Sequence, residues 1–572
     1  MPTLNWIGKE AVVNHDKEVP FRLLKKVKSA SVGENSQNLI VHGDNLEALK
    51  ALMPYYSGKV KCVYIDPPYN TGSEGWVYND KVSSPKIKKW LGKVVGKESE
   101  DLCHHDKWLC MMYPRLKMLR DLLTDEGVVI IHIDENEIAH LKILMDEIFG
   151  ESNDLGTIVW DKRNPKGDSQ KVSYQHESIV LFAKNIESIR GSFSVKKVHA
   201  EGMLKKAIQL LSKLGKVELP EEIKRIAKEY NLPKDCLEKQ SKLFTLEDVN
   251  NEFQAWLKRQ DFTAGEKAYR FIDSNGKVYR GVSMAWPNKS KAPDDYWIPI
   301  VHPATKKECP LPSRGWRYPG STMKKLLEKG YILFGEDHKK QPERKYLLEE
   351  NMSQNLTSLI SFGGSDDALQ EQLGYKFENP KPVAFAEKIL EIFTGANDIV
   401  LDSFAGSGTT AHAVLKLNDS DKKNRKFILV EMEDAVVKDI TAERVKRAIK
   451  KYNYKDGFEY CELSKPLFDE EGQIEGSCDF NQFATYIYFT ETQTNIDPAK
   501  IAENFIGEHS EREYYLIYKE KGENLLGKSF LKKLRKNDVV KVVYADKCLL
   551  DNDTLERYNI VFKQIPYEVK VY

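Results

Sequence analysis

The sequence has almost no excess charge of one sign, few cysteines and no long apolar run. Its 572 residues include 87 Lys and Arg against 86 Asp and Glu, so the formal net charge is 87 − 86 = +1. The longest apolar run, Gly127 to Ile133, is far shorter than the roughly 18 residues that a membrane-spanning helix needs. These features exclude a polybasic tail protein and a membrane-spanning protein. A hydrophobic content of 41% excludes a chain that is mainly disordered.

The eight cysteines are scattered along the chain, and no two of them form a C-x-x-C pair. Neither a disulfide framework nor a zinc knuckle is therefore indicated, and we expect reduced, mostly buried thiols. The stretch from Met1 to Pro20 is polar and has no apolar core followed by a cleavage site. It is not typical of a secretion signal, so a cytoplasmic location is expected.

Short apolar strands alternate with amphipathic helices in two separate stretches of the chain. This alternation favours an α/β class with a doubly wound sheet, whose ligands sit at the carboxyl ends of the strands. The predicted strands are 38–41, 61–65, 128–133, 398–401 and 426–430. The predicted helices are 46–53, 108–123, 135–149, 383–393 and 434–450.

The alternation is lost between about residues 190 and 370, which indicates an inserted domain. Lysine-rich helices are predicted there at 204–214, 220–230 and 246–258, before a segment rich in Pro, Trp, Arg and Lys. After about residue 466 the pattern changes again, to short strands and helices that resemble a small separate domain. The length is in keeping with this division, because domains of roughly 100 to 200 residues give three or four structural units.

The tetrapeptide Asp66-Pro67-Pro68-Tyr69 directly follows the predicted strand 61–65. Two prolines end the strand and fix the backbone, because proline has no N–H group for the ladder. Asp66 and the Pro67 carbonyl could accept both protons of an exocyclic amine and direct its lone pair at an electrophile. The Tyr69 ring could stack on a flat heterocycle. The alternative interpretation is an ordinary proline turn after a strand.

A glycine-rich loop, residues 404–408, lies between a predicted strand and a predicted helix. Glycines let the backbone approach a ligand closely, and the start of a helix offers free N–H groups to a carboxylate or phosphate. Glu431 ends the next predicted strand, which places a carboxylate beside the same crevice, where it can bind ribose hydroxyls. The combination predicts a nucleotide-type cofactor site, and the alternative is a tight structural turn.

The D-P-P-Y motif together with Phe404-Ala-Gly-Ser-Gly408 resembles the S-adenosylmethionine-dependent DNA amino-methyltransferases. The catalytic motif comes first and the cofactor motif last, 404 − 69 = 335 positions later, which resembles the β class of these enzymes. Three further stretches are similar in kind to these enzymes: Asp134 to Glu137, His176-Glu177 before a predicted strand, and Asn379 to Pro382. The tract from Trp76 to Pro114, including His105 to Arg115, and the closing Phe562 to Tyr567 resemble the modification (Mod) subunits of type III restriction systems.

The resemblance implies a fold and a division of the chain. The fold would be a doubly wound, Rossmann-like methyltransferase core, circularly permuted, with an inserted α+β target recognition domain and a small C-terminal domain. Residues 1–190 would carry the catalytic motif, 191–370 would recognise the target, 371–465 would carry the cofactor loop, and 466–572 would serve assembly or partner contact.

The resemblance also implies a role for each residue of the catalytic motif. Asp66 and the Pro67 carbonyl would bind the target amine of a flipped base, held by the stiff Pro68 turn, and Tyr69 would stack on that base. Asp rather than Ser at the first position favours adenine N6 over cytosine N4 in this family.

On the cofactor side, Glu431 would hold the ribose hydroxyls, Asp44 the adenine amine and Lys381 the methionine carboxylate. For Asp44 and Lys381 the alternative is a helix cap or a solvated charge. Ser403 departs from related proteins, which more often have proline there. Further contacts to S-adenosylmethionine are implied for Asp402, Phe404, Ala405, Gly406, Gly408 and Thr409.

The implied function is site-specific transfer of a methyl group from S-adenosylmethionine to adenine N6 in duplex DNA, with no metal needed for the transfer. The implied partners are double-stranded DNA, a second copy of the chain and a Res helicase-endonuclease subunit. Two alternatives stay open. One is a DNA-binding specificity subunit with incidental methylation that recruits a helicase-nuclease, and the other is an RNA or protein methyltransferase.

DNA contact is compatible with a net charge near zero if the positive charge is concentrated locally. Three basic clusters interleaved with aromatic residues, at 162–171, 306–318 and 339–345, are suited to phosphate contact and base stacking. The alternative for each is a solvated face. A match to the phosphate-loop pattern G-x-x-x-x-G-K-S at 522–529 is interpreted as accidental, because only 572 − 521 = 51 residues remain for a nucleotide-binding sheet.

Overall fold

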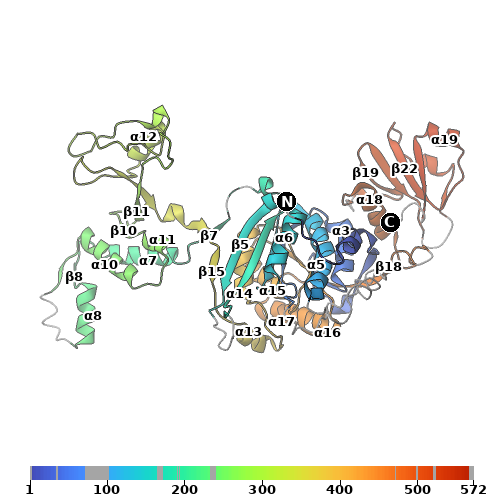
Figure 1. Cartoon of the computed structure of the whole chain (residues 1–572), viewed down its shortest axis with the longest axis horizontal. Coiled ribbons are helices and arrows are strands. Elements are labelled where there is room, and N and C mark those ends of the chain that lie inside the picture. The colour runs from blue at the N-terminus through green and yellow to red at the C-terminus, as the bar shows by residue number, and fades with distance from the viewer. Residues whose placement is uncertain are drawn as a thin grey trace. The chain divides into compact units, whose positions relative to one another are not determined.

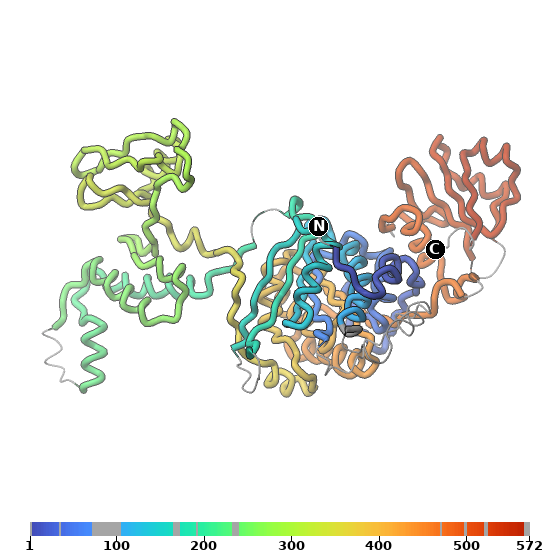
Figure 2. Tube along the Cα trace, in the orientation of Figure 1, coloured from blue at the N-terminus to red at the C-terminus, as the bar shows by residue number. Residues whose placement is uncertain are grey.

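The computed structural model of the chain describes two compact units (Figures 1 and 2). Met1–Gly191 folds together with Thr357–Tyr572, and Ser192–Leu356 forms the second unit, called the insert below. The structure describes residues 3–33, 36–70, 102–163, 172–189, 191, 193–231, 240–469, 472–496, 500–519 and 524–565. Several predictions fall partly outside these ranges, namely those on 76–101, 164–171, 522–523 and 566–567.

A ten-stranded sheet forms the centre of the larger unit. Six neighbouring strands run parallel: β18 (Glu459–Pro466), β2 (Leu39–His42), β17 (Lys426–Glu431), β16 (Ile399–Asp402), β3 (Val60–Ile65) and β4 (Leu123–Ile133). One antiparallel strand flanks them on each side: β1 (Arg22–Lys26) beyond β18, and β6 (His176–Ala183) beyond β4. β5 (Asp154–Asp161) pairs antiparallel with β6 and so runs in the direction of the six. β15 (Leu359–Ser361) closes the far edge, parallel to β5.

The two distant stretches of the sequence interleave within this sheet. β16 pairs with β17 on one side and with β3 on the other, so blue and orange tubes run side by side in Figure 2. The chain leaves β16 toward β17 but leaves β3 toward β4, in opposite directions across the sheet. This reversal of strand order is a topological switch point, where α/β sheets form their ligand crevice.

Helices of the larger unit cover this sheet as the apolar periodicity predicts. The apolar runs of the central strands are buried on both faces, with Val63, Ile65 and Ile131 fully inaccessible. The helices are α3 (Asn45–Tyr56), α5 (Leu102–Leu122), α6 (Ile138–Phe149), α14 (Val383–Phe393), α15 (Thr409–Asp421), α16 (Asp434–Val436) and α17 (Glu443–Tyr452). A π-helical turn, Val437–Ala442, separates the last two, so the helix predicted at 434–450 is not continuous.

The insert combines helices with small sheets, and its core is divided. One apolar cluster gathers around Phe253 and Tyr269, and a second around Trp316 and Met323. Its main elements are α7 (Ala200–Leu211), α8 (Glu221–Glu229), α10 (Leu246–Lys258), α12 (Gly320–Glu328), and a sheet of β10 (Phe271–Ile272), β11 (Val278–Ser283), β13 (Glu343–Leu347) and β12 (Ile332–Leu333). β7 (Ser194–Lys196) pairs with β14 (Ser353–Asn355), where the chain enters and leaves this unit.

The last hundred residues form a smaller sheet with two apolar clusters, one of which also takes in Phe21 and Leu23. The sheet contains β19 (Phe505–His509), β20 (Arg512–Leu516), β22 (Val540–Ala545) and β24 (Ile560–Gln564), accompanied by α18 (Phe480–Thr492) and α19 (Asn552–Arg557). Ser529, at the end of the phosphate-loop match, precedes a four-residue 3-10 helix in place of the α-helix that a phosphate loop opens. Among the described residues, no helix combines the length and apolar character needed to cross a membrane.

Candidate active site

Acidic side chains follow the carboxyl ends of neighbouring parallel strands in the central sheet. Parallel strands end at the same edge, so the sheet brings these acids to one side of the switch point. They are Asp44 after β2, Asp66 after β3, Asp134 after β4, Asp402 at the end of β16 and Glu431 at the end of β17. Two of them, Asp66 and Asp402, belong to adjacent strands.

The side chain of Asp66 takes part in a compact network with Tyr69 and Lys381. The Tyr69 hydroxyl donates to Asp66 Oδ1 at 2.6 Å, and Lys381 Nζ lies 2.8 Å from Asp66 Oδ2. Lys381 Nζ also donates to the Tyr69 hydroxyl oxygen at 2.8 Å and lies 4.9 Å from the centre of the Tyr69 ring. The D-P-P-Y turn is also held by helix α5, because Trp108 Nε1 donates to the Pro68 carbonyl at 2.7 Å.

A second carboxylate, Glu177 at the start of β6, completes this network. Glu177 Oε2 lies 3.4 Å from Lys381 Nζ and accepts from the Tyr69 hydroxyl at 3.3 Å, while Lys162 pairs with Glu177 Oε1. Glu177 lies in a stretch that resembles the family, but no function is predicted for it from the sequence. The signal that could have found it is an acid at the start of an otherwise apolar strand.

The network lowers the pKa of Asp66 and raises the pKa values of Lys381 and Tyr69. Burial alone would raise the pKa of Asp66, but the charge of Lys381 and the hydrogen bonds from Lys381 and Tyr69 hold it below its ordinary value. Burial opposes the charge of Lys381, yet Asp66 and Glu177 raise its pKa. Burial and then Asp66 raise the pKa of Tyr69 well above its usual range. At neutral pH the site therefore presents an ionised Asp66 and a protonated lysine.

The cofactor-type loop is shaped by its glycines and by the π-helical turn behind it. Gly406 and Gly408 have left-handed φ angles of 47° and 79°. The Thr441 hydroxyl donates to the Gly406 carbonyl at 2.6 Å, and Arg444 Nη1 donates to the Ser407 hydroxyl oxygen at 2.6 Å. Arg444 is fully buried, and it is not recognisable from the sequence because it lies on a helix with an ordinary basic face.

Two buried carboxylates hold the other side of the loop. Asp402 Oδ1 accepts from Phe404 N at 3.0 Å, and its Oδ2 accepts from the Thr410 hydroxyl at 2.5 Å. Glu431 Oε2 accepts from Gly406 N at 2.8 Å, while the N–H groups that follow bind its other oxygen. Burial raises the pKa of Asp402 to about 7 and also raises the pKa of Glu431, because in the described structure neither has a cationic partner.

The remaining predicted residues lie at the borders of these two sites. Asp44 caps α3, and its Oδ1 accepts from Leu46 N at 2.9 Å, which is the cap that the alternative interpretation expected. The start of α3 also contacts the glycine-rich loop, since Asn45 Nδ2 donates to the Ser403 carbonyl at 3.1 Å. Gly43 N donates to the Glu431 carbonyl at 3.0 Å.

Lys381 connects the two sites. Its carbonyl accepts from the Thr409 hydroxyl at 3.2 Å, while its ammonium group contacts Asp66 and not the glycine loop. The structure thus brings the predicted residues 402–409 and 431 together, and 66–69 with Lys381. It does not test what any of them binds, so the assigned roles stay predictions.

The described parts of the three basic clusters differ in what they leave exposed. Arg344 stacks on Tyr318 and Tyr346, with its guanidinium carbon 5.0 and 4.4 Å from the ring centres, and Lys345 pairs with Asp273 at 2.5 Å. These cations are engaged within the insert. The exposed members are Arg163, Lys306, Lys307, Arg314, Arg317, Lys339 and Lys340.

Comparison with known proteins relates this architecture to a family. The family model described as DNA methylase matches residues 60–443. The chain is 32% identical to the type III restriction-modification enzyme EcoP15I Mod subunit of Escherichia coli, over 86% of this chain and 75% of that protein. It is 31% identical to the EcoPI Mod subunit of Escherichia phage P1, over 78% of this chain and 68% of that protein.

A solved structure of a DNA modification methylase from Thermus thermophilus, complexed with S-adenosyl-L-methionine, covers 74% of this chain and 99% of its own. It shares 12% identity with this chain, at a TM-score of 0.31. The family match spans both the strand that precedes D-P-P-Y and the glycine loop, which the fold joins at one switch point. The chain therefore belongs to the DNA methylases, and among them to the Mod subunits of type III restriction-modification systems.

Proposed function

We propose that this chain transfers a methyl group from S-adenosylmethionine to adenine N6 at a specific site in duplex DNA, as the modification and recognition subunit of a type III system. One observation carries the proposal. The D-P-P-Y motif and the glycine loop follow adjacent parallel strands, β3 and β16, although 335 positions separate them in the sequence. A methyl acceptor held by one and a methyl donor held by the other would meet at the switch point.

The polar groups beside the glycine-rich loop fit S-adenosylmethionine. Glu431 is a buried carboxylate suited to the ribose hydroxyls, and Ser403 Oγ is a buried hydroxyl without a hydrogen-bond partner among the described residues. Asp44 borders the same loop and is proposed for the adenine amine, and Lys381 for the methionine carboxylate. When bound, the cofactor supplies a methyl group made electrophilic by a positively charged sulfur. The contacts proposed for the loop are Asp402, Phe404, Ala405, Gly406, Gly408 and Thr409.

On the acceptor side, the ionised Asp66 and the Pro67 carbonyl accept hydrogen bonds from the target amine. These bonds draw the nitrogen lone pair out of the ring and hold it toward the cofactor side, which is positioning and electrostatic work. The new N–C bond forms from this lone pair as the S–C bond breaks, and one amine proton passes to Asp66 and then to water. The base is flipped out of the duplex to reach Asp66, and it stacks on the face of Tyr69 opposite Lys381.

The insert is proposed as the target recognition domain. Its exposed lysines and arginines match the phosphate contacts that fix a protein's register on DNA, and its exposed polar surface can reach base edges. Double-stranded DNA is thus the proposed substrate. A Res helicase-endonuclease subunit and a second copy of this chain are the proposed protein partners, with the sheet at 505–564 as the region for assembly.

The test measures methyl transfer from labelled cofactor to duplex DNA of mixed sequence. Asp66→Ala removes the proposed acceptor of the amine protons, so incorporation should fall by about a hundredfold or more. Cofactor binding, measured by calorimetry, should persist because the glycine loop is unchanged. Asp125→Ala, at an acid of the same unit with 80% of its side chain exposed, is the matched control and should behave like the wild type.

Two results would decide against the proposal. Equal incorporation by the wild type and Asp66→Ala would remove the role of Asp66. Nucleoside analysis of the methylated DNA identifies the acceptor, and N4-methylcytosine instead of N6-methyladenine would overturn the choice of base.

A further inference from the structure

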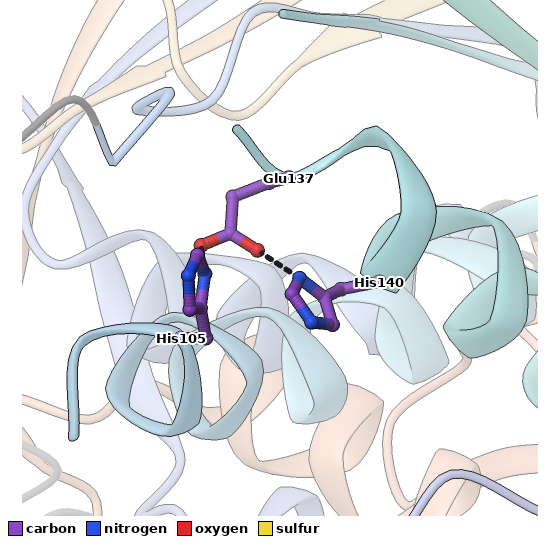
Figure 3. Close-up of side chains that lie close together, drawn as sticks. All are labelled: His105, Glu137 and His140. Carbon is purple, nitrogen blue, oxygen red and sulfur yellow. Dashed lines mark hydrogen bonds and ion pairs between the residues drawn. The ribbon is translucent and has the colours of Figure 1, made fainter. Parts of the chain in front are cut away.

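A buried carboxylate with two histidines lies beside the catalytic motif but outside the network described above. Glu137, at the start of α6, is completely inaccessible to solvent, and His105 on α5 and His140 on α6 converge on it (Figure 3). His105 Nδ1 lies 2.6 Å from Glu137 Oε1, and His140 Nδ1 lies 2.8 Å from Glu137 Oε2. Within the part of the chain that the structure describes, this is the one such group of three.

In the part of the chain that the structure describes, no lysine or arginine compensates the charge of Glu137. Among the described residues, its ion pairs go to the two imidazoles and none goes to a lysine or an arginine. A buried carboxylate costs much free energy unless it is paired or coordinates a metal ion. This distinguishes Glu137 from Asp66 and Glu177, which share the ammonium group of Lys381.

Two imidazole nitrogens and one carboxylate are the donor set of many first-row transition-metal sites, and of zinc in particular. The three ligand atoms all lie within 4.8 Å of one another. Zinc bonds of about 2.0–2.1 Å place tetrahedral ligands about 3.3 Å apart. The two histidines, 2.6 and 2.8 Å from the carboxylate oxygens, would have to open by about half an ångström to admit the ion.

The spacing within the chain favours such a site. Glu137 and His140 are three positions apart at the start of one helix, so both side chains lie on one face of it. His105 comes from a different helix, α5, whose side chains pack against α6 in the same apolar core. An ion at this place would cross-link the two helices. The partial exposure of both imidazoles, 42% for His105 and 33% for His140, leaves a path from solvent.

We propose that His105, Glu137 and His140 bind one divalent transition-metal ion. Two imidazoles and one carboxylate favour zinc. The ion takes no part in methyl transfer. Its effect reaches the active site through Asn70, the residue after Tyr69, whose side-chain amide donates to Glu137 Oε1. Asn70 is buried and has a left-handed φ of 61°, so its position depends on such a contact. The site thereby anchors the end of the D-P-P-Y turn to α5 and α6.

The experiment titrates ZnCl2 into the full-length chain, stripped beforehand with a chelator, by calorimetry. We expect one zinc ion per chain and a higher Tm in its presence, since an ion that binds the folded state stabilises it. Glu137→Gln and His140→Ala should weaken binding by at least about tenfold, and His140→Cys, which replaces one zinc ligand by another, should restore part of it.

His199→Ala is the matched control. His199 lies 3.2 Å from the buried Glu266 in the insert with similar exposure, but this pair has no second histidine. Its zinc affinity should stay within about twofold of the wild type. Substituted Co²⁺ should show the d–d absorption of a nitrogen and oxygen site, without the charge-transfer band of a thiolate.

Three results would overturn the proposal. The first is no zinc uptake by the wild type, which would leave a hydrogen-bonded cluster only. The second is uptake that Glu137→Gln and His140→Ala do not change, and the third is a thiolate spectrum. None of these readouts uses methyl transfer, so failure here is distinguishable from failure of the proposed reaction.

Discussion

Two aspartates at the ends of neighbouring strands have pKa values shifted in opposite directions. Asp66 follows β3 and Asp402 ends β16, and the strands are hydrogen-bonded to each other. The pKa of Asp66 lies below its ordinary value, and the pKa of Asp402 is raised to about 7. Lys381 explains the difference, because its ammonium group lies 2.8 Å from Asp66 while Asp402 has only a hydroxyl and a peptide N–H.

The comparison shows that position at a sheet edge does not decide ionisation. Burial pushes both carboxylates toward the neutral form, and only a cation from elsewhere in the chain reverses the effect. The proposed catalytic side therefore depends on charge partners: Lys381, from a distant segment, for Asp66, and Lys162 for Glu177. The cofactor side depends on backbone geometry, with glycines at positive φ and peptide N–H groups as donors.

Removing the cation should have the largest effect. Lys381→Met leaves Asp66 beside Glu177 without the ammonium group they share, so that only Lys162 on Glu177 remains as a counter-charge, and breaking a buried pair costs about 3–5 kcal/mol. One third of the Asp66 side chain is exposed, so we expect a loss of about 2–4 kcal/mol in the free energy of unfolding, measured with urea. Methyl transfer should fall together with the stability, because Asp66 loses the neighbouring charge that lowers its pKa and keeps it ionised.

The control for this variant is Lys416→Met, which breaks an exposed pair with Glu387 at 2.7 Å and should cost less than about 1 kcal/mol. Adding Glu177→Gln to Lys381→Met should restore part of the lost stability. Equal losses in the Lys381 and Lys416 variants would contradict the distinction drawn between the two sides.

On the cofactor side, a change of backbone shape should have the next largest effect. A Cβ at Gly408, where φ is 79°, would lie 3.2 Å from Thr441 Cγ2 and 3.3 Å from the Thr441 carbonyl oxygen. Gly408→Ala should cost about 2–3 kcal/mol, from left-handed strain plus this contact, and weaken cofactor binding measured by calorimetry. Gly58→Ala, with φ of 66° and open space around it, should cost only the strain, about 1–2 kcal/mol.

The smallest effect is a pH dependence at Asp402. Its raised pKa means that the folded state binds a proton more tightly than the unfolded state, so stability falls as pH rises from about 4 to about 7. Asp402→Asn keeps an acceptor for Phe404 N and removes this dependence. The free energy of unfolding of the variant minus that of the wild type should be larger at pH 8 than at pH 5, by on the order of 1–2 kcal/mol. A constant difference between the two pH values would contradict the assignment.

Much of the central sheet was predictable because its signals are local. The apolar runs at 61–65 and 426–430 became β3 and β17, and the helix at 383–393 has the predicted bounds. The predicted strands did not include β1, β5, β15 and β18, which belong to the same mixed sheet of ten strands. These four strands carry polar or mixed sequences whose extended form depends on pairing with a neighbour, and no local pattern reports that pairing.

By itself the sequence determined the motifs, the family and which residue types stand at the strand ends, because those depend on neighbours a few positions away. The tertiary structure alone decided the partners: Lys381 with Asp66, Glu177 with Tyr69, Arg444 with Ser407, and His105 with Glu137. For Lys381 and Asp66 the reason is strand order, because placing β16 beside β3 joins two distant stretches of the chain, and the charges that meet there set the ionisation of Asp66. The other pairs lie closer together in the sequence and meet because their helices, strands and loops pack against one another, which no local pattern reports.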